Sequence, residues 1–254
     1  MTHVLVLHGN GGSRTRFIPL LRKMMIEHPE INLVIPQLSG FDGRVLPPSD
    51  NYWDLFLEDV YAAVAENIEE EWVLYGHGIG GSLLMELAAR DFTFPNGQQL
   101  KVRKVYLHSI IGAALHTRKF PLLMKPMALR KFGKWLVTRA MLRPMWEKRL
   151  FQNPEEIPLF LREQFFIDYT ICDAFVVFFD LITVPWYREV RSKTHDYPFH
   201  LIWGKEERVV KVEVLDLWRE DFPKATVEIV ADWDHFPMLE QPEAFAEKFL
   251  GWVR

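Results

Sequence analysis

Short runs of apolar residues alternate along this chain with longer amphipathic stretches. The runs have the composition and spacing of β-strands, and they lie at Val4–Leu7, Asn32–Ile35, Trp72–Tyr75, Val102–Leu107, His200–Trp203 and Thr226–Val230. Apolar residues at helical spacing predict helices at about residues 14–27, 51–69, 82–90, 212–220 and 242–253. This alternation predicts an α/β fold, a mostly parallel, doubly wound sheet of about six strands with helices on both faces.

The chain between the fourth and fifth predicted strands has a different pattern. About ninety residues there show helical periodicity and no convincing strand. We therefore expect a core formed by residues 1–115 and 196–254, with a helical cap insertion at residues 116–195 over the sheet. The most apolar part of the insertion, Ile171–Trp186, is interrupted by two aspartates and a proline. It is predicted to be a buried helix rather than a membrane span, with Cys172 as a small buried hydrophobe.

A glycine-rich turn joins the third predicted strand to the helix that follows it. It reads Gly76-His77-Gly78-Ile79-Gly80-Gly81. A sharp turn from strand to helix strains any residue that carries a Cβ, and it places its central residue at the edge of the sheet. Taken alone, such a turn could also hold a phosphate group or serve only packing. Its meaning therefore depends on the other loops at this edge.

Three more loops follow predicted strands and reach the same edge of a parallel sheet. The segment His8-Gly9-Asn10-Gly11-Gly12-Ser13 follows the first strand, residues 202–210 with Glu207 follow the fifth, and residues 234–242 with His235 follow the sixth. Together with the glycine turn, and in this chain order, these loops resemble the α/β-hydrolase superfamily, in which the turn reads Gly-x-Ser-x-Gly. The resemblance covers nearly the whole chain and is weakest in the insertion.

The resemblance implies a role for each loop. Gly78 holds the position of the nucleophilic serine, Glu207 that of the acid and His235 that of the general base. The backbone N–H groups of Asn10 and Ile79 correspond to the oxyanion hole. Further residues expected at the pocket are His8, Gly9, His77 and Ser109.

Three departures from the family pattern stand out. Glycine at position 78 removes the nucleophile, Glu207 is one methylene longer than the usual aspartate, and Gln37 replaces an aspartate often found after the second strand. Only the first prevents the standard mechanism, because glycine has no side chain that can form an acyl-enzyme. Ser13 and Ser82 are poorly placed to substitute. Ser109 follows the fourth strand at the same edge and is the remaining candidate hydroxyl.

These residues leave three functional hypotheses. The chain is a small-molecule or carboxylic-ester hydrolase in which Gly78 abolishes acyl-enzyme chemistry, or an enzyme in which His235 and Glu207 act directly as a general base on substrate or water, or a pseudoenzyme that only binds a ligand. For His235, the alternative to a catalytic role is a structural one, as a loop histidine hydrogen-bonded to Glu207. For His77 and His108, packing or pocket-wall roles are favoured over catalysis.

Composition limits the partners, cofactors and cellular location that we expect for this chain. The net charge of −4 gives no reason to expect nucleic acid as a partner. The single cysteine and the absence of a recognisable export signal lead us to expect a reducing, cytoplasmic location. No cofactor and no metal are implied, because the histidines form no ligand cluster and the glycine turn lacks a nucleotide-binding spacing.

Charge is concentrated in the predicted cap. Ten Lys and Arg lie between His116 and Arg149 against only Glu147, which is a local charge of +9 and leaves −13 for the rest of the chain. Leu129, Phe132, Leu136 and Ala140 form an apolar line, and Arg130, Lys131, Lys134 and Arg139 lie largely off it. We expect the apolar line to face the sheet domain above a pocket for an apolar or acyl substrate. The alternative is contact between the basic segment 118–149 and an anionic membrane surface or ligand.

Overall fold

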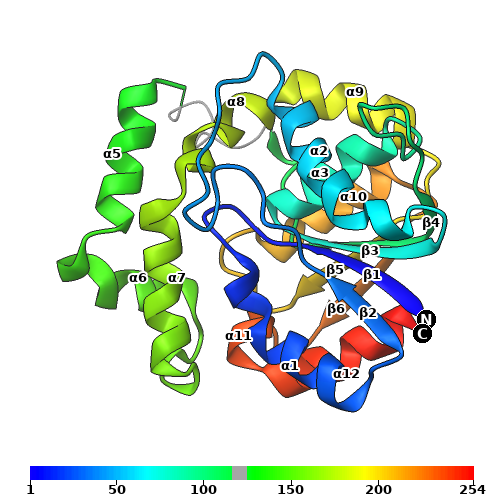
Figure 1. Cartoon of the computed structure of the whole chain (residues 1–254). Helices are drawn as coiled ribbons and strands as arrows, with labels where there is room; N and C mark the ends of the chain where they lie inside the picture. The colour runs from blue at the N-terminus through cyan, green and yellow to red at the C-terminus, as the bar shows by residue number, and fades with distance from the viewer. Residues whose placement is uncertain (116–124) are drawn as a thin grey trace.

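The predicted α/β fold is confirmed by a computed structural model, which describes residues 1–115 and 125–254. Its sheet has six parallel strands in the order β2-β1-β3-β4-β5-β6 (Figure 1). The strands are β1 (Thr2–Leu7), β2 (Ile31–Val34), β3 (Glu71–His77), β4 (Lys101–His108), β5 (His200–Gly204) and β6 (Thr226–Val230). The chain order switches direction between β1 and β3, so the loops after these two strands open a crevice at the carboxyl edge of the sheet.

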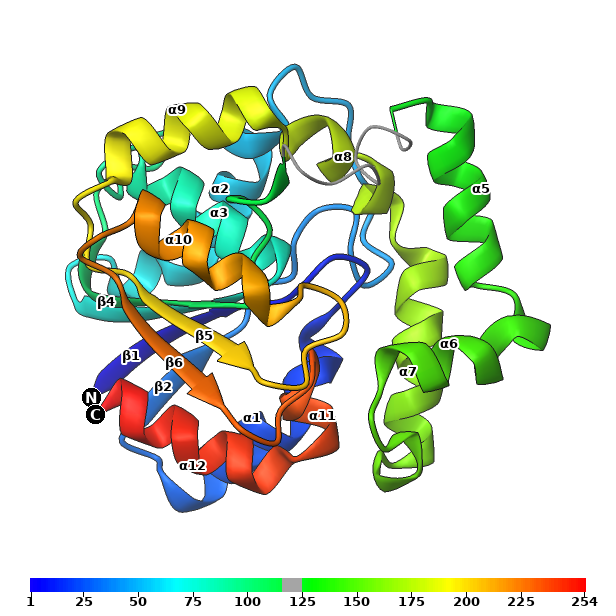
Figure 2. The same ribbon diagram turned by 180° about the vertical axis from the view of Figure 1, so that it is seen from behind.

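Helices cover both faces of the sheet (Figures 1 and 2). One face carries α1 (Ile18–Glu27), α11 (Pro237–Glu240) and α12 (Pro242–Val253), and the other carries α2 (Tyr52–Val64), α3 (Ile79–Ala88), α9 (Val184–Thr194) and α10 (Leu215–Asp221). The side chains of β1 alternate between the two layers: Val4 and Val6 belong to one apolar cluster, and Leu5 and Leu7 to the other. Burial on both faces explains why this strand is an unbroken apolar run.

Three helix starts differ from the predicted ones. The predicted helix at 212–220 opens with a 3-10 turn, Val212–Val214, before α10. The predicted helix at 14–27 opens with a 3-10 turn, Arg14–Phe17, whose cap is the hydroxyl of Ser13 accepting from the N–H of Thr15. Helix α3 begins at Ile79, three residues before the predicted Ser82, because a single residue, Gly78, makes the whole turn out of β3. The cap of α2 is Asn51, whose side chain accepts from the N–H of Trp53.

The insertion is helical where it is described, and residues 116–124 of the predicted cap lie outside the described residues. Helices α5 (Met127–Val137), α6 (Arg143–Leu150) and α7 (Leu159–Ile171) stand beside the sheet layers (Figure 1). The prediction of one helix over the apolar stretch 171–186 is wrong. The stretch forms a 3-10 turn, α8 (Phe178–Leu181) and the start of α9. Cys172 is buried, as expected, and α9 packs on α3.

Helix α5 is not oriented as predicted. Arg130 is buried and its guanidinium donates to Asp180 (2.6 Å), while Nζ of Lys134 donates to the carbonyl of Cys172 (2.7 Å). Leu129 and Phe132, expected to face the sheet domain, are 45% and 56% exposed. The reason is that residues 172–180 offer acceptors to Arg130 and Lys134, which draws these two side chains inward, whereas Lys131 and Arg139 stay exposed. No helix within residues 1–115 or 125–254 combines the length and apolar character needed to cross a membrane.

Candidate active site

The turn between β3 and α3 depends on glycine at specific positions. Gly78 has φ +55° and ψ −120°, and its N–H donates to the carbonyl of His108 (2.9 Å). A Cβ added at Gly76 would lie 2.5 Å from the N of Gly81, and one added at Gly80 would lie 2.5 Å from the carbonyl oxygen of Leu7. At Gly78 the nearest atom is the Cα of Gly9 at 3.5 Å, an ordinary contact. The turn therefore requires glycine on both sides of residue 78 but has room for a side chain at residue 78.

Stability measurements test this difference. We expect Gly80→Ala to lower the free energy of unfolding by about 2–3 kcal/mol, because a methyl group there collides with backbone. Gly78→Ala is expected to cost about 1 kcal/mol, from positive φ alone. Urea unfolding of both variants measures the two values. An equal or larger loss for Gly78→Ala would contradict the geometry.

An acid–base pair lies across from this turn. Nδ1 of His235 donates to Oε2 of Glu207 at 2.8 Å, and the same oxygen accepts from the hydroxyl of Ser109 at 2.6 Å. The other carboxylate oxygen accepts the N–H groups of Val209 (2.7 Å) and Val210 (2.9 Å). Burial alone raises the pKa of Glu207, but the charge of His235 and hydrogen bonds from His235, Ser109 and Val210 outweigh it and lower the pKa to about 2. Glu207 is thus an ionised group that fixes the orientation of the imidazole ring.

The other ring nitrogen of His235 is available for chemistry. Within the described part of the chain Nε2 has no hydrogen-bond partner, and the ring borders a hollow of about 110 Å³ together with Gly78. The backbone carbonyl of His235 accepts from Nε2 of His77 (2.9 Å), whose ring lies 4.6 Å from that of His235. The structure thus brings most of the expected site residues around one hollow, which is lined by Gly9, Asn10, His77, Gly78, Ile79, Ser109 and His235, among others. His8, predicted at the pocket, does not line it, because its ring is buried against Phe41.

The loop after β1 forms the opposite wall of the hollow. The side chain of Asn10 donates to the carbonyl of Phe175 (3.2 Å) and accepts from the N–H of Gly11 (2.9 Å). Ile79 opens α3, where first-turn N–H groups have no acceptor within the helix. Asn10 and Ile79 therefore border the hollow from two different loops, with backbone at close range to position 78.

Arg16 supports this loop and was not identified from the sequence. It is 2% exposed, and its guanidinium lies so close to Gly12 that a Cβ there would approach it to 2.8 Å. The guanidinium carbon lies 4.5 Å from the ring centre of Phe165 in α7, within the range of a cation–π contact. An arginine in the first turn of a predicted helix is expected at the surface, so only the folded chain reveals that Arg16 joins the loop to α7 of the insertion.

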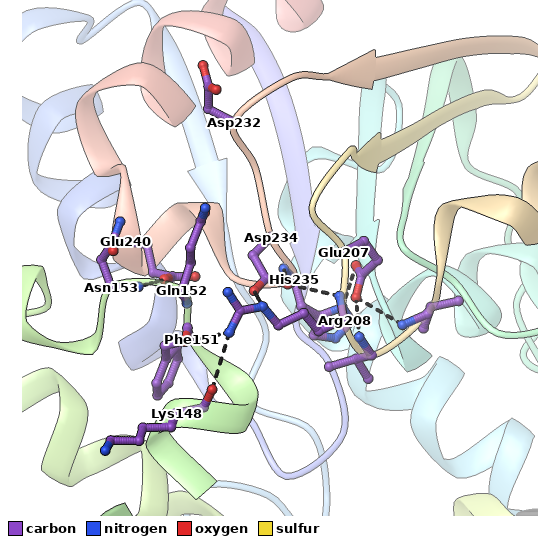
Figure 3. A network of polar contacts seen from close by, with 12 residues as sticks. Lys148, Phe151, Gln152, Asn153, Glu207, Arg208, Asp232, Asp234, His235 and Glu240 are labelled. Carbon is purple, nitrogen blue, oxygen red and sulfur yellow. Dashed lines mark hydrogen bonds and ion pairs between the residues drawn. The ribbon is translucent and has the colours of Figure 1, made fainter. Parts of the chain in front are cut away.

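Arg208 connects the loops that carry Glu207 and His235 with the insertion (Figure 3). Its Nε pairs with Oδ2 of the buried Asp234 at 2.9 Å, and Oδ1 of Asp234 accepts the N–H groups of Arg208 and His235. Nη1 of Arg208 donates to the carbonyls of Lys148 and Phe151 at the end of α6, both at 3.2 Å. Arg208 and Asp234, which adjoin Glu207 and His235 in the chain, thus hold the two loops together. Nothing in the sequence indicated this contact beyond their positions next to predicted site residues.

The remaining histidines at the site are buried and neutral. Burial lowers the pKa of His8 to about 4 and that of His108 to about 3, and it holds the pKa of His77 well below its usual range. Nδ1 of His108 is hydrogen-bonded to the hydroxyl of Tyr75 at 2.5 Å. These contacts agree with the packing and pocket-wall roles expected for His77 and His108.

Their burial predicts acid-sensitive stability. The stabilisation from a neutral buried histidine is fully present above its unfolded pKa of 6.5 and is lost as the pH falls toward the folded value, about 4 for His8. Between pH 6.5 and 5 we expect His8 alone to account for about 1.5 kcal/mol of lost unfolding free energy. Urea unfolding across this range should show a shallower slope for His8→Asn. The same slope in both chains would contradict the assignment.

A larger apolar cavity adjoins the hollow. Its volume is about 290 Å³, and it shares Asn10, Ile79, Ile111, Tyr169 and Val209 with the hollow. Its other walls come mainly from the insertion and are apolar: Leu115, Val137, Trp146, Leu150, Phe175, Phe178, Phe179 and Ile182. Among the described residues no group of three His, Cys, Asp or Glu side chains is arranged to hold a metal ion.

Two curated relatives have similar sequences. The chain is 24% identical over 272 residues to Lipase 1 of Psychrobacter immobilis. This alignment covers 97% of this chain and 75% of the lipase. The chain is 22% identical to Lipase 3 of Moraxella sp. (strain TA144), covering 93% of this chain and 72% of that protein.

Solved structures have the same fold. A thermophilic esterase from Thermogutta terrifontis has a TM-score of 0.69 at 16% identity, covering 100% of this chain and 90% of the esterase. A bromoperoxidase from Bacillus anthracis has a TM-score of 0.73 at 17% identity, covering 99% and 91%. At these identities the similarity concerns the fold. Residues 4–248, however, match the family described as the alpha/beta hydrolase family. The chain therefore belongs to the alpha/beta hydrolase family.

Proposed function

We propose that this chain carries the site of a carboxylic-ester or similar small-molecule hydrolase in which Gly78 stands at the nucleophile position, so that acyl-enzyme hydrolysis is lost. One observation carries the proposal: the turn excludes a Cβ at Gly76 and Gly80 but accommodates one at Gly78, which borders the hollow containing His235. If the turn served only packing, space for a side chain at residue 78 would not be expected.

The surrounding groups have the chemistry that a serine there would use. Nε2 of His235 would take the hydroxyl proton and return it to the leaving group, while Glu207 holds the ring and stabilises the imidazolium. The N–H groups of Asn10 and Ile79 would stabilise the oxyanion of the tetrahedral intermediate. Without a hydroxyl at residue 78, none of these groups has a nucleophile to activate by this route.

The proposed substrate is a carboxylic ester or other small acyl compound with an apolar group. The 290 Å³ cavity beside the hollow suits such a group, because aromatic and aliphatic side chains form most of its wall. Lipases and an esterase among the similar proteins support the same class.

A second candidate is direct general-base catalysis by His235. It is favoured by the complete His235–Glu207 pair in a chain that has no side chain at residue 78, since the free Nε2 could deprotonate a bound substrate or water in the hollow.

A third outcome is a pseudoenzyme that binds a ligand without turnover. Ester hydrolysis by the chain as it stands, by Gly78→Ser and by the corresponding His235→Ala variants separates all three.

A further inference from the structure

The exposed apolar side chains of this protein are concentrated on the insertion. Within residues 1–115 and 125–254, seventeen large apolar side chains are exposed, and ten of these belong to residues 127–171. Isolated exposed apolar residues are normal on a protein surface, whereas a concentration on one layer indicates contact with something else. That layer, formed by α5, α6 and α7, stands to one side of the sheet in both views (Figures 1 and 2).

Helix α5 presents aromatic rings to solvent while burying Arg130. The rings of Phe132 and Trp135 are stacked, with centroids 5.6 Å apart, and are 56% and 47% exposed as residues. The guanidinium of Arg139 lies 4.1 Å from the centre of the Trp135 ring. Arg130, by contrast, is 3% exposed. An aromatic pair with a cation over one ring, on the outer side of a helix, matches the composition of a surface that meets lipid headgroups.

The charge of the same layer is complementary to an anionic surface. Residues 125–146 contain six Lys and Arg and no Asp or Glu. Lys125, Lys131 and Arg139 are exposed, and Glu147, the next acid along the chain, is paired with Arg162. Cations beside exposed aromatic rings give both of the attractions that hold a helix at an anionic membrane surface.

We propose that the outer side of α5, formed by Lys131, Phe132, Trp135 and Arg139, docks on an anionic lipid surface. A small anionic ligand explains the outer side less well, because the pocket of about 610 Å³ that Lys125 and Arg130 line includes neither Lys131 nor Arg139. A second copy of the chain would set these cations against each other. Since α5 and α6 also supply Val137, Trp146 and Leu150 to the 290 Å³ cavity, docking places the lipid surface beside it. The proposal does not depend on chemistry at residue 78.

Vesicle co-sedimentation of the full chain tests this proposal. We expect binding to vesicles of equimolar phosphatidylcholine and phosphatidylglycerol, at least tenfold weaker binding to pure phosphatidylcholine, and weakening by salt. The double variants Phe132→Ser/Trp135→Ser and Lys131→Glu/Arg139→Glu should each reduce binding at least tenfold. The matched control is Ile229→Ser, an exposed apolar residue on β6, which should bind as the unaltered chain does.

Further measurements keep the result interpretable. Brominated lipid should quench the fluorescence of the unaltered chain more than that of Trp135→Phe. Circular dichroism and the thermal midpoint establish that each variant is folded, as expected for exposed positions. Absence of binding, equal binding to both kinds of vesicle, or equal loss in Ile229→Ser would overturn the proposal. So would analytical ultracentrifugation that finds a dimer dissolved by Phe132→Ser/Trp135→Ser, because α5 would then be the interface between two copies.

Discussion

Gly78→Ser is expected to hydrolyse short-chain p-nitrophenyl esters at initial rates at least about 10³-fold above those of the unaltered chain. The physical reason is that the missing hydroxyl would enter a turn with room for it, in a hollow where Nε2 of His235 has no partner among the described residues. Positive φ at residue 78 costs about 1 kcal/mol, which is small compared with the stability of a folded domain. The experiment compares both chains at matched concentration and ester.

Two control variants locate the source of the turnover. Gly78→Ala introduces the same backbone strain without a nucleophile and should remain inactive, and Gly78→Ser/His235→Ala should lose the activity gained. Hydrolysis by the unaltered chain that disappears in His235→Ala would instead favour direct general-base catalysis. No gain from serine over alanine in a folded variant would contradict the proposed function.

Glu207→Gln, introduced beside Gly78→Ser, is expected to lower kcat by about 10²- to 10⁴-fold. The amide has nearly the shape of the carboxylate, but it is neutral, cannot stabilise the imidazolium and favours the wrong tautomer of His235. The matched control is Glu206→Gln, which removes the same charge from the exposed neighbouring residue. If both substitutions lower kcat alike, Glu207 does not act through His235. Michaelis kinetics with one ester provide both values.

The strands and the loops after them could be predicted because their signals are local. A buried parallel strand is a continuous apolar run, as in β1, and glycine at residues 76 and 80 follows from contacts within a few residues of the turn or with the neighbouring strand. Parallel pairing then sets the loops at one edge of the sheet, which is why Glu207 and His235, far apart in sequence, lie at hydrogen-bond distance.

The orientation of α5 could not be predicted, because it depends on partners distant in the chain. Its apolar line predicted the buried side, yet Arg130 pairs with Asp180, fifty residues away, and this brings Arg130 inward and leaves Leu129 and Phe132 exposed. The same applies to Arg16 on Phe165 and to Arg208 at the end of α6. Hydrophobic periodicity indicates how apolar one side of a helix is. It does not indicate which hydrogen-bond acceptors elsewhere in the chain a Lys or Arg side chain will contact.

The most direct test of the disarmed-hydrolase account is covalent labelling with a fluorophosphonate, read by intact-protein and peptide mass spectrometry. The reagent reports an activated hydroxyl without requiring the right ester. The account predicts one adduct per chain on residue 78 in Gly78→Ser, much slower labelling when His235→Ala is added, and none in the unaltered chain or Gly78→Ala. An unlabelled Gly78→Ser chain that is folded, or an adduct on Ser109 instead, would contradict it.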